Sequence, residues 1–314
     1  MKVLIIGAAG FSGGHLIDLL SQQTDIEIFA SKLKTEKLDR SGSNITVLDL
    51  DILHKDEVSD LISQIRPDYI IQLAAISSVS YSWKEPALTF DINVIGTINI
   101  LEAVRKSEIN PRILLIGSAE EYGNVKPESL PIKEDCSIDP RSPYAVSKVS
   151  QEMTARMYAS VYNMEIVMVR AFNHIGPGQT PVFAIPGFAE QIAKIEKGMQ
   201  EPVIKVGNLS VKRDFTDVRD IVRGYWDLVR YGEAGEVYNI GSGKSYSLQT
   251  ILDTLISMSN KKIITEIDPG KFRPADIPEL RADISKIYKK INWKPEIDIN
   301  TTLSDILEYW RKKC

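Results

Sequence analysis

Short apolar runs alternate with amphipathic segments along most of this chain of 314 residues. The runs are rich in Val, Ile and Leu and have the length of strands, whereas the segments between them repeat their apolar positions with helical spacing. Continuous apolar strands separated by helices are typical of a parallel sheet that is covered on both faces. We therefore predict an α/β fold with a doubly wound parallel sheet, whose strands lie at residues 2–6, 26–30, 45–48, 69–73, 112–116, 165–170 and 237–240.

The pattern changes after Arg170, where glycine and proline interrupt the chain at residues 176–181 and again at 268–278. Such punctuation favours turns over long regular elements. We predict a smaller C-terminal α/β lobe from residues 173–215 and 246–314, and a nucleotide-binding domain from residues 1–172 and 216–245. We expect the four tryptophans to lie in the core: Trp83, Trp226, Trp293 and Trp310.

The first predicted strand is followed by Gly7, Gly10 and Gly13 and then by a helical segment. In this arrangement the first glycine permits a tight turn, the second lets the backbone approach a pyrophosphate, and the third lets the helix pack on the strand. The start of the helix attracts phosphate, and Phe11 and the Ser12 hydroxyl lie in the same turn. An ordinary glycine-rich turn is the alternative, but the flanking strand and helix favour a Rossmann-like dinucleotide site.

Composition narrows the function classes. With 43% hydrophobic and 25% charged residues and a net charge of −4, the chain lacks the basic character of a nucleic-acid-binding protein. We find no apolar segment of membrane length and no signal peptide, so we expect a cytoplasmic protein with neither nucleic-acid nor membrane partners. Cys136 and Cys314 stand far apart and the three histidines are scattered, which favours free thiols and no metal site.

Ligands of an open parallel sheet bind beyond the carboxyl ends of its strands. After the second strand come Ser31, Lys32 and then Lys34, where an NAD site usually offers an acidic residue. We therefore expect NADP(H) in preference to NAD(H), with Ser31 and Lys32 on the 2′-phosphate, although an exposed basic loop has the same composition. Asp49 and Leu50 follow the third strand and either bracket the adenine or cap a turn.

The loops after the fourth and fifth strands supply the rest of this predicted site. Small residues after the fourth strand would let a cofactor lie against the backbone: Leu73, Ala74 and Ala75. Ser77 follows them and is a candidate for contact with the substrate. Ser118 and Glu120 follow the fifth strand and place a hydroxyl and a carboxylate beside the cofactor.

Tyr144 and Lys148 stand four residues apart on a segment that begins at Pro143 and is predicted to be helical. Residues at this spacing lie on the same face of a helix. An ammonium beside a phenol lowers the phenol pKa, which makes the tyrosine a better acid–base group near neutral pH. A solvent-exposed pair is the common alternative, but the glycine turn and Ser118 favour a site where Ser118, Tyr144 and Lys148 converge on one carbonyl.

With these residues the chain resembles the extended short-chain dehydrogenases/reductases that modify nucleotide sugars, over essentially its whole length. The motifs that carry the resemblance are Gly7-x-x-Gly10-x-x-Gly13, Asp49-Leu50, Asn93-Val-Ile-Gly-Thr97, Ser118 and Tyr144-x-x-x-Lys148. Ile6 departs from the pattern, since many members have Thr there. Residues 170–179, 206–220 and 273–278 are similar to the GDP-mannose branch of the family.

The resemblance implies NAD(P)H-dependent reduction of the 4-keto group of GDP-4-keto-6-deoxy-D-mannose to GDP-D-rhamnose. Tyr144 would protonate the sugar oxygen while Ser118 polarises the carbonyl. Lys148 would bind the nicotinamide ribose and lower the Tyr144 pKa, with Asn93 supporting Lys148 through water.

Glu120 does not fit simple ketone reduction, because related 4,6-dehydratases use a glutamate at this place as the base that removes water. The short loop at residues 31–37 favours the reductase instead. GDP-mannose 4,6-dehydration stays open as the second reading. Behind it come nucleotide-sugar 4-epimerisation and a non-catalytic role in sensing NADP(H).

The smaller lobe is expected to hold a GDP-sugar. Arg213 and Arg273 are the candidates for the pyrophosphate, because a guanidinium can bond two oxygens at once. Asn173 would add an amide and Val206 would line the base. The alternative places both arginines in surface ion pairs with nearby aspartates. The resemblance also implies a homodimer, formed by the long segments at residues 87–107 and 144–162.

Overall fold

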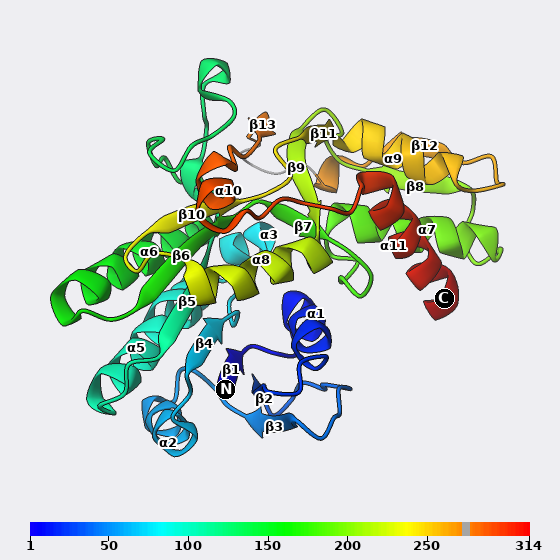
Figure 1. Ribbon diagram of the computed structural model, residues 1–314. Helices are drawn as coiled ribbons and strands as arrows, with labels where there is room; N and C mark the ends of the chain where they lie inside the picture. The colour runs from blue at the N-terminus through cyan, green and yellow to red at the C-terminus, as the bar shows by residue number, and fades with distance from the viewer. Residues whose placement is uncertain (272–276) are drawn as a thin grey trace.

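A seven-stranded parallel sheet runs through the larger lobe of the molecule (Figure 1). The structure is a computed structural model and describes residues 1–271 and 277–314. The strands lie in the order β10-β6-β5-β4-β1-β2-β3. All seven were predicted, with bounds that differ by at most two residues: β1 (Lys2–Ile6), β2 (Glu27–Lys32), β3 (Ile45–Asp49), β4 (Tyr69–Gln72), β5 (Arg112–Ser118), β6 (Ile166–Ala171) and β10 (Val237–Ile240).

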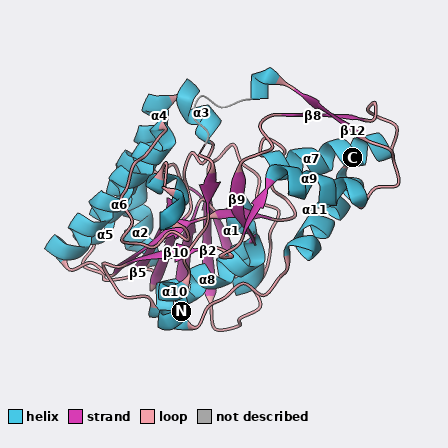
Figure 2. Ribbon diagram, turned by 90° about the horizontal axis from the view of Figure 1, so that it is seen from above, coloured by secondary structure: helices cyan, strands magenta, loops and turns pink. Residues whose placement is uncertain are grey.

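Helices cover both faces of this sheet, as Figure 2 shows from above. One face carries α1 (Phe11–Leu20), α8 (Val218–Tyr231) and α10 (Ser285–Ile291), and the other carries α2 (Lys55–Ile65), α5 (Gly96–Lys106) and α6 (Pro143–Tyr162). Successive residues of β1 face opposite layers: Val3 and Ile5 lie in one core, whereas Leu4 and Ile6 lie in the other. Burial on both faces explains why the strands are continuous apolar runs in the sequence.

One long helix contradicts the prediction that no apolar segment has membrane length. After α3 (Val79–Lys84), the elements α4 (Pro86–Phe90), a π-helical turn (Asp91–Ile95) and α5 follow without a break. The segment Pro86–Lys106 contains an 18-residue window with a mean hydropathy of 1.4 and is long enough to cross a membrane. The segment packs against α2 and α6, and 44% of that window is buried inside the fold. A core helix has the same composition, so this single segment is weak evidence for a membrane span.

The smaller lobe lies to the right in Figure 1 and contains the C-terminus. One sheet joins β7 (Asn173–Ile175), β9 (Lys212–Asp217), β11 (Ser245–Ser247) and β13 (Glu279–Leu280), and a second pairs β8 (Val203–Val206) with β12 (Ile264–Ile267). Its helices are α7 (Ala184–Glu196), α9 (Leu248–Ser257) and α11 (Ile299–Lys313). These three helices enclose an apolar core of their own, separate from the two cores of the large sheet.

Two expectations about packing need correction. Trp83 was expected in the core, but it lies on α3 with 48% of its surface exposed, whereas the other three tryptophans are buried. The segment 246–314 was assigned to the smaller lobe, yet Ile287 of α10 and Trp293 pack in the core of the larger sheet. The Trp293 indole N–H also donates to Asp220 O on α8, at 3.0 Å. We therefore propose to move residues 285–293 to the nucleotide-binding domain, and the rest of the division stays a proposal.

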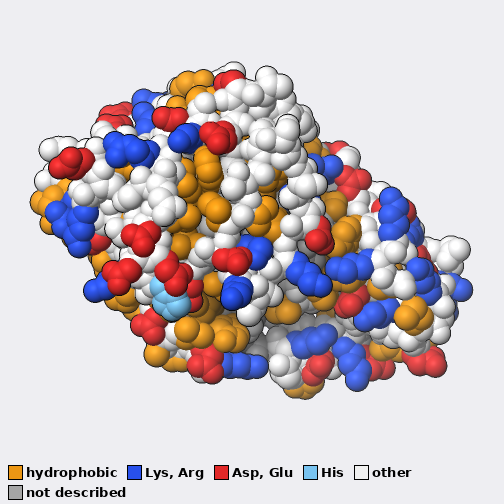
Figure 3. Space-filling model, turned by 90° about the horizontal axis from the view of Figure 1, so that it is seen from below, with side chains coloured by type: hydrophobic (Ala, Val, Ile, Leu, Met, Phe, Trp, Pro, Cys, Tyr) orange, Lys and Arg blue, Asp and Glu red, His pale blue; other side chains and the backbone are white. Residues whose placement is uncertain are grey.

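Charged side chains of both signs are interleaved on the face drawn in Figure 3. Lys and Arg lie among Asp and Glu over both lobes, and no extended area of one sign stands out on this face. The mixture agrees with the net charge of −4.

Candidate active site

The glycine turn forms a cradle between β1, β4 and α1. Gly7 has a φ of +84°, which favours glycine, and a Cβ there would lie 2.5 Å from Ala74 N. A Cβ on Gly13 would lie 2.5 Å from Ala8 O. Gly10 directly precedes α1, so the unpaired N–H groups of the first helical turn face the same space. The turn thus has the shape and the donors that a pyrophosphate requires.

The Ser12 hydroxyl, predicted to contact phosphate, has a protein partner in the structure. Its Oγ lies 3.0 Å from His174 Nε2, and His174 Nδ1 lies 3.2 Å from the Phe172 carbonyl oxygen. Burial lowers the pKa of His174, so the ring is neutral and carries its proton on Nδ1, facing that carbonyl. Nε2 is then the acceptor, and the Ser12 hydroxyl donates to it, so its contact with a phosphate stays a prediction. Phe11 stacks on His174 with ring centroids 6.0 Å apart, so the start of α1 lies against β7.

Residues after β2 and β3 come together at the neighbouring edge of the cradle. Lys32 Nζ lies 2.5 Å from Asp49 Oδ1, so two side chains predicted to contact different parts of the cofactor form an ion pair. Ser31 is 1% exposed, and its Oγ has no hydrogen-bond partner among the described residues. A buried hydroxyl without a partner fits a site that a ribose or phosphate oxygen would complete. Leu50, which follows Asp49, packs in the apolar core between the sheet and the helices α2 and α5.

The loop after β4 is fixed by two amides. The Gln72 side chain donates to Ala74 O and accepts from Ala74 N, both at 3.1 Å. These two bonds hold the backbone of the loop at the residue between Leu73 and Ala75. Asn93, in the π-helical turn, accepts from Ile76 N at 2.9 Å and donates to Ile76 O at 3.1 Å. Ser77, one residue on, is exposed.

Among the described residues Asn93 makes no direct hydrogen bond to Lys148, and its support of Lys148 through water stays a prediction. Its second N–H donates to Ser147 Oγ at 2.9 Å, so both N–H bonds of the amide are used. The side chain joins the loop after β4 to α6, which positions the helix that carries Tyr144 and Lys148.

Ser118 and Tyr144 meet at the carboxyl end of β5. Ser118 is the last residue of that strand, and its Oγ accepts the Glu120 N–H at 3.2 Å where the short helix Ala119–Tyr122 begins. Tyr144 lies in the first turn of α6, which begins after the capping residue Ser142. Its backbone N–H donates to Ser82 Oγ at 3.1 Å. The phenol is hydrogen-bonded to Ser118 and almost fully buried.

The pKa of Tyr144 is raised, contrary to the prediction that Lys148 lowers it. Burial raises it most, the hydrogen bond with Ser118 works against this, and the carboxyl groups of Glu120 and Glu121 raise it further. Lys148 has no part in the shift, because its ammonium turns toward β5. It donates to Ile116 O at 2.9 Å and to Gln151 Oε1 at 2.8 Å.

Burial also lowers the pKa of Lys148, to about 8, while Glu121 works in the opposite direction. Of the three N–H bonds on the ammonium, Ile116 and Gln151 take two. The third remains for a ligand hydroxyl. Gln151 is itself held by Thr97, whose Oγ1 accepts from Gln151 Nε2 at 2.9 Å.

A buried charge cluster behind Ser118 was missed by the sequence analysis. Arg170 is 2% exposed and donates to both oxygens of Glu152, at 2.8 Å each. Its Nε also lies 3.6 Å from Glu121 Oε2. Charged residues are almost never fully buried unless they are paired, but the sequence shows only their charge and not their burial.

The predicted substrate residues of the smaller lobe are spread more widely. Arg213 is mostly buried and its NH1 donates to Ile277 O at 2.7 Å. Asn173 is exposed. Val206 is only 1% exposed and packs in the core of the lobe, so its side chain does not line a ligand surface as expected. Arg273 lies outside the described residues.

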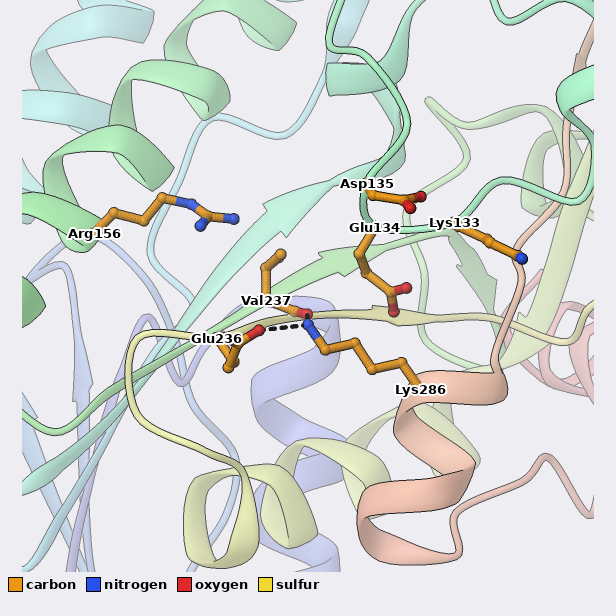
Figure 4. Close-up of a pocket in the computed structure, with 7 residues that line it drawn as sticks. All are labelled: Lys133, Glu134, Asp135, Arg156, Glu236, Val237 and Lys286. Atoms are coloured by element: carbon orange, nitrogen blue, oxygen red, sulfur yellow. Dashed lines mark hydrogen bonds and ion pairs between the residues drawn. The ribbon is translucent and has the colours of Figure 1, made fainter.

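A separate cavity of about 360 Å³ lies at the opposite end of the large sheet (Figure 4). It opens beside Val237, the first residue of β10, whereas Ser118 is the last residue of β5. Charges of both signs line it: Lys133, Glu134, Asp135, Arg156, Glu236 and Lys286. Lys286 is paired with Glu236 at 2.7 Å, and we do not place the active site here. Among the residues described, no group of three His, Cys, Asp or Glu side chains is arranged to hold a metal ion.

Known proteins are similar to this chain in sequence and in fold. The sequence matches the family described as GDP-mannose 4,6 dehydratase over residues 4–306. It is 35% identical over 263 residues to a GDP-6-deoxy-D-mannose reductase of Pseudomonas aeruginosa, covering 84% of this chain and 86% of the relative. RMD from Pseudomonas aeruginosa complexed with NADPH superposes with a TM-score of 0.88 at 31% identity, covering 100% of both chains. The UDP-glucose 4-epimerase of Thermus thermophilus in complex with NAD superposes with a TM-score of 0.88 at 25% identity, again over 100% of both chains.

The parallel sheet, the glycine turn and the cluster of Ser118, Tyr144 and Lys148 define a short-chain dehydrogenase/reductase that uses a pyridine nucleotide. With the match over residues 4–306, the chain belongs to the GDP-mannose 4,6-dehydratase family of extended short-chain dehydrogenases/reductases, which confirms the resemblance predicted from its motifs. It is an NAD(P)-dependent enzyme.

Proposed function

We propose that this enzyme uses NADPH to reduce the 4-keto group of GDP-4-keto-6-deoxy-D-mannose, giving GDP-D-rhamnose. One observation carries the proposal: Ser118 and Tyr144 meet at the carboxyl end of β5, the edge of the sheet that also carries the glycine turn, in a chain that is 35% identical to a GDP-6-deoxy-D-mannose reductase. Lys148 bonds Ile116 O, two residues before Ser118. When bound, the nicotinamide supplies the hydride. The chain's own residues supply the proton and hold the carbonyl.

The protonation state of Tyr144 suits a reduction. Because its pKa is raised by burial, the phenol keeps its proton throughout the neutral range. A ketone that receives hydride needs a proton on its oxygen, and a protonated phenol can give one. Ser118 is hydrogen-bonded to the phenol, so its hydroxyl stands where it can polarise the same carbonyl.

Lys148 would contribute through its remaining N–H bond, aimed at the ribose of the cofactor. NADP(H) over NAD(H) stays part of the proposal, supported by the partnerless Ser31 hydroxyl and by Lys32 at the edge of the cradle. Asp49 already neutralises Lys32, so a 2′-phosphate would have to compete with this carboxylate for the ammonium.

GDP-mannose 4,6-dehydration is the second candidate, and the place of Glu120 favours it. This carboxylate lies near enough to Tyr144 to raise the tyrosine pKa, and its side chain is only half-buried. A base that removes water from a sugar must lie beside the group that handles the carbonyl oxygen. Glu120 meets that condition.

We also propose that the enzyme is a cytoplasmic homodimer. Exposed apolar side chains follow one stripe of α6, at Val146, Met153, Met157 and Val161, and Ile95 is exposed on the neighbouring helix. A second copy of this stripe would cover both. Sedimentation of the wild type and of Met153→Glu tests the dimer, because a charge in the stripe would leave monomers.

Turnover assays separate the two reactions. Purified enzyme is given NADPH with GDP-4-keto-6-deoxy-D-mannose, and in a second experiment GDP-mannose with NADP⁺. Consumption of NADPH with formation of GDP-rhamnose supports the reductase. A 4-keto-6-deoxy product in the second experiment would replace the reductase with the dehydratase, and the Glu120→Gln variant would then lose that product.

A further inference from the structure

The first turn of α6 contains two backbone N–H groups that no carbonyl of the helix can accept. Its first residue is Pro143, which has no N–H. Ala145 N donates at 3.1 Å to the side chain of the capping residue Ser142, within the same turn. Tyr144 N donates instead to Ser82 Oγ, at 3.1 Å, and Ser82 belongs to α3. The residue that carries the phenol is thus the one whose N–H depends on another helix.

The two hydrogen bonds of the Ser82 hydroxyl have a definite direction. It donates its own proton to Val79 O, at 2.8 Å, because a carbonyl can only accept. Its oxygen accepts from Tyr144 N, because a backbone N–H can only donate. Ser82 has no exposed surface, and a buried N–H without an acceptor is costly. If this hydroxyl were lost, the start of α6 would have to shift toward another acceptor.

The backbone carbonyl of Tyr144 is held as well, and from the same part of the chain. Ser147 Oγ donates to it at 2.7 Å and accepts from Asn93 Nδ2 at 2.9 Å. The Asn93 amide also bonds both backbone groups of Ile76. Ile76 and Ser82 are the two ends of the stretch that leads from the loop after β4 into α3. Both ends are therefore linked to the backbone of Tyr144.

We propose that Ser82 is a positioning residue for the reaction: its hydroxyl holds the start of α6 where the phenol of Tyr144 meets Ser118 on β5. The proposal rests on the proposed function, because it takes Tyr144 as the acid that protonates the sugar oxygen. The phenol is almost fully buried and is bonded to Ser118, so a shift of the helix start moves its proton relative to that hydroxyl. A displacement of about 1 Å can lower a reaction rate by about 10²-fold.

The test replaces Ser82 with alanine, which removes the acceptor of Tyr144 N and adds no atom. We measure the rate of NADPH oxidation in a single turnover, with enzyme and NADPH in excess over the keto sugar. We expect this rate to fall by about tenfold or more in Ser82→Ala, because the acid is displaced. The dissociation constant for NADPH, measured by fluorescence, should not change, because neither bond of the hydroxyl reaches the glycine turn.

Thr89→Val is the matched control. Thr89 lies on α4 with no exposed surface, and its hydroxyl donates to Glu85 O at 2.8 Å. The variant therefore removes a hydroxyl that is as deeply buried as that of Ser82 but has no bond to α6. We expect a loss of stability in urea similar to that of Ser82→Ala, together with the single-turnover rate of the wild type.

Hydrogen exchange of the Tyr144 amide tests the contact without any substrate. In protein labelled with ¹⁵N-tyrosine, the signal of this amide is the one lost in Tyr144→Phe. It should exchange slowly in the wild type and in Thr89→Val, and about tenfold faster or more in Ser82→Ala.

Two results would overturn the proposal. One is fast exchange of the Tyr144 amide in the wild type, which decides the question even if Ser82→Ala does not fold. The other is a single-turnover rate in Ser82→Ala equal to that in Thr89→Val. Failure of the wild type to reduce the keto sugar overturns the proposed function alone, since the exchange experiment needs no turnover.

Discussion

Gly7→Ala tests the cofactor cradle by adding one methyl group. The φ of +84° costs an alanine about 1–2 kcal/mol, because Cβ then approaches the following carbonyl. The new Cβ would also stand 2.5 Å from Ala74 N, whereas ordinary contact begins at 3.4 Å, so the loop after β4 has to move by about 0.9 Å. Forcing an extra methyl group into a packed site costs about a further 1–3 kcal/mol.

A matched glycine separates the two costs. Gly235 has a φ of +82°, but a Cβ there meets no atom within 4 Å. Gly235→Ala should therefore lower the free energy of unfolding by about 1–2 kcal/mol, from backbone strain alone. Gly7→Ala should lower it by at least about 1 kcal/mol more, since the contact is added to the same strain.

Urea denaturation measures both stabilities, and NADPH fluorescence measures the affinity for the cofactor. We expect Gly7→Ala to weaken NADPH binding by about tenfold or more, which corresponds to about 1.4 kcal/mol, and Gly235→Ala to leave it unchanged. Equal losses of stability in the two variants, with unchanged NADPH affinity in both, would refute the reasoning about the cradle.

Three further predictions follow from the site. Tyr144→Phe should lower kcat/KM by about 10²–10⁴ while NADPH still binds, whereas Tyr158→Phe on the same helix should react at the wild-type rate; comparable rates in both variants would remove Tyr144 as the acid. Lys32→Ala should weaken the binding of NADPH more than that of NADH, and equal losses in a titration with both cofactors would end its assignment to the 2′-phosphate. Arg170→Met should lower the free energy of unfolding by about 3–5 kcal/mol, because it removes the buried guanidinium that bonds both oxygens of Glu152 and leaves that carboxylate with Arg156 alone. A loss below about 1 kcal/mol in chemical denaturation would speak against that pairing.

The sheet was predictable because its signals are local. A strand buried on both faces is a continuous apolar run, and the glycine turn carries its meaning in seven consecutive residues between a strand and a helix. The position of Tyr144 near Ser118 also followed from a local rule, since each lies where an element begins or ends at the carboxyl edge of the sheet.

The contacts around those residues depend on long-range packing. Ser12 and His174 are separated by 162 residues, and nothing in the sequence near Ser12 shows that a buried imidazole accepts a hydrogen bond from its hydroxyl. The i, i+4 rule placed Lys148 on the right face of α6, but the carbonyl of Ile116 in β5 decides where its ammonium turns. Nothing in the sequence distinguishes Glu121 from other acidic residues in loops, because its place in the interior depends on the room that Gly117 leaves for its carboxyl group.

The connections through which the chain passes from one lobe to the other differ in length. Phe172 alone separates β6 from β7, and β9 passes directly into α8 between Asp217 and Val218. From β10 to β11 the chain has four residues, including Gly241 and Gly243, which has a φ of +73°. An engineer who exchanged the smaller lobe for that of a relative would thus have four residues to join at 241–244, provided that Asp214 of β9 is kept to bond Ser242 and Gly243. A junction at Phe172 or Asp217 would have to match the geometry of both lobes at once.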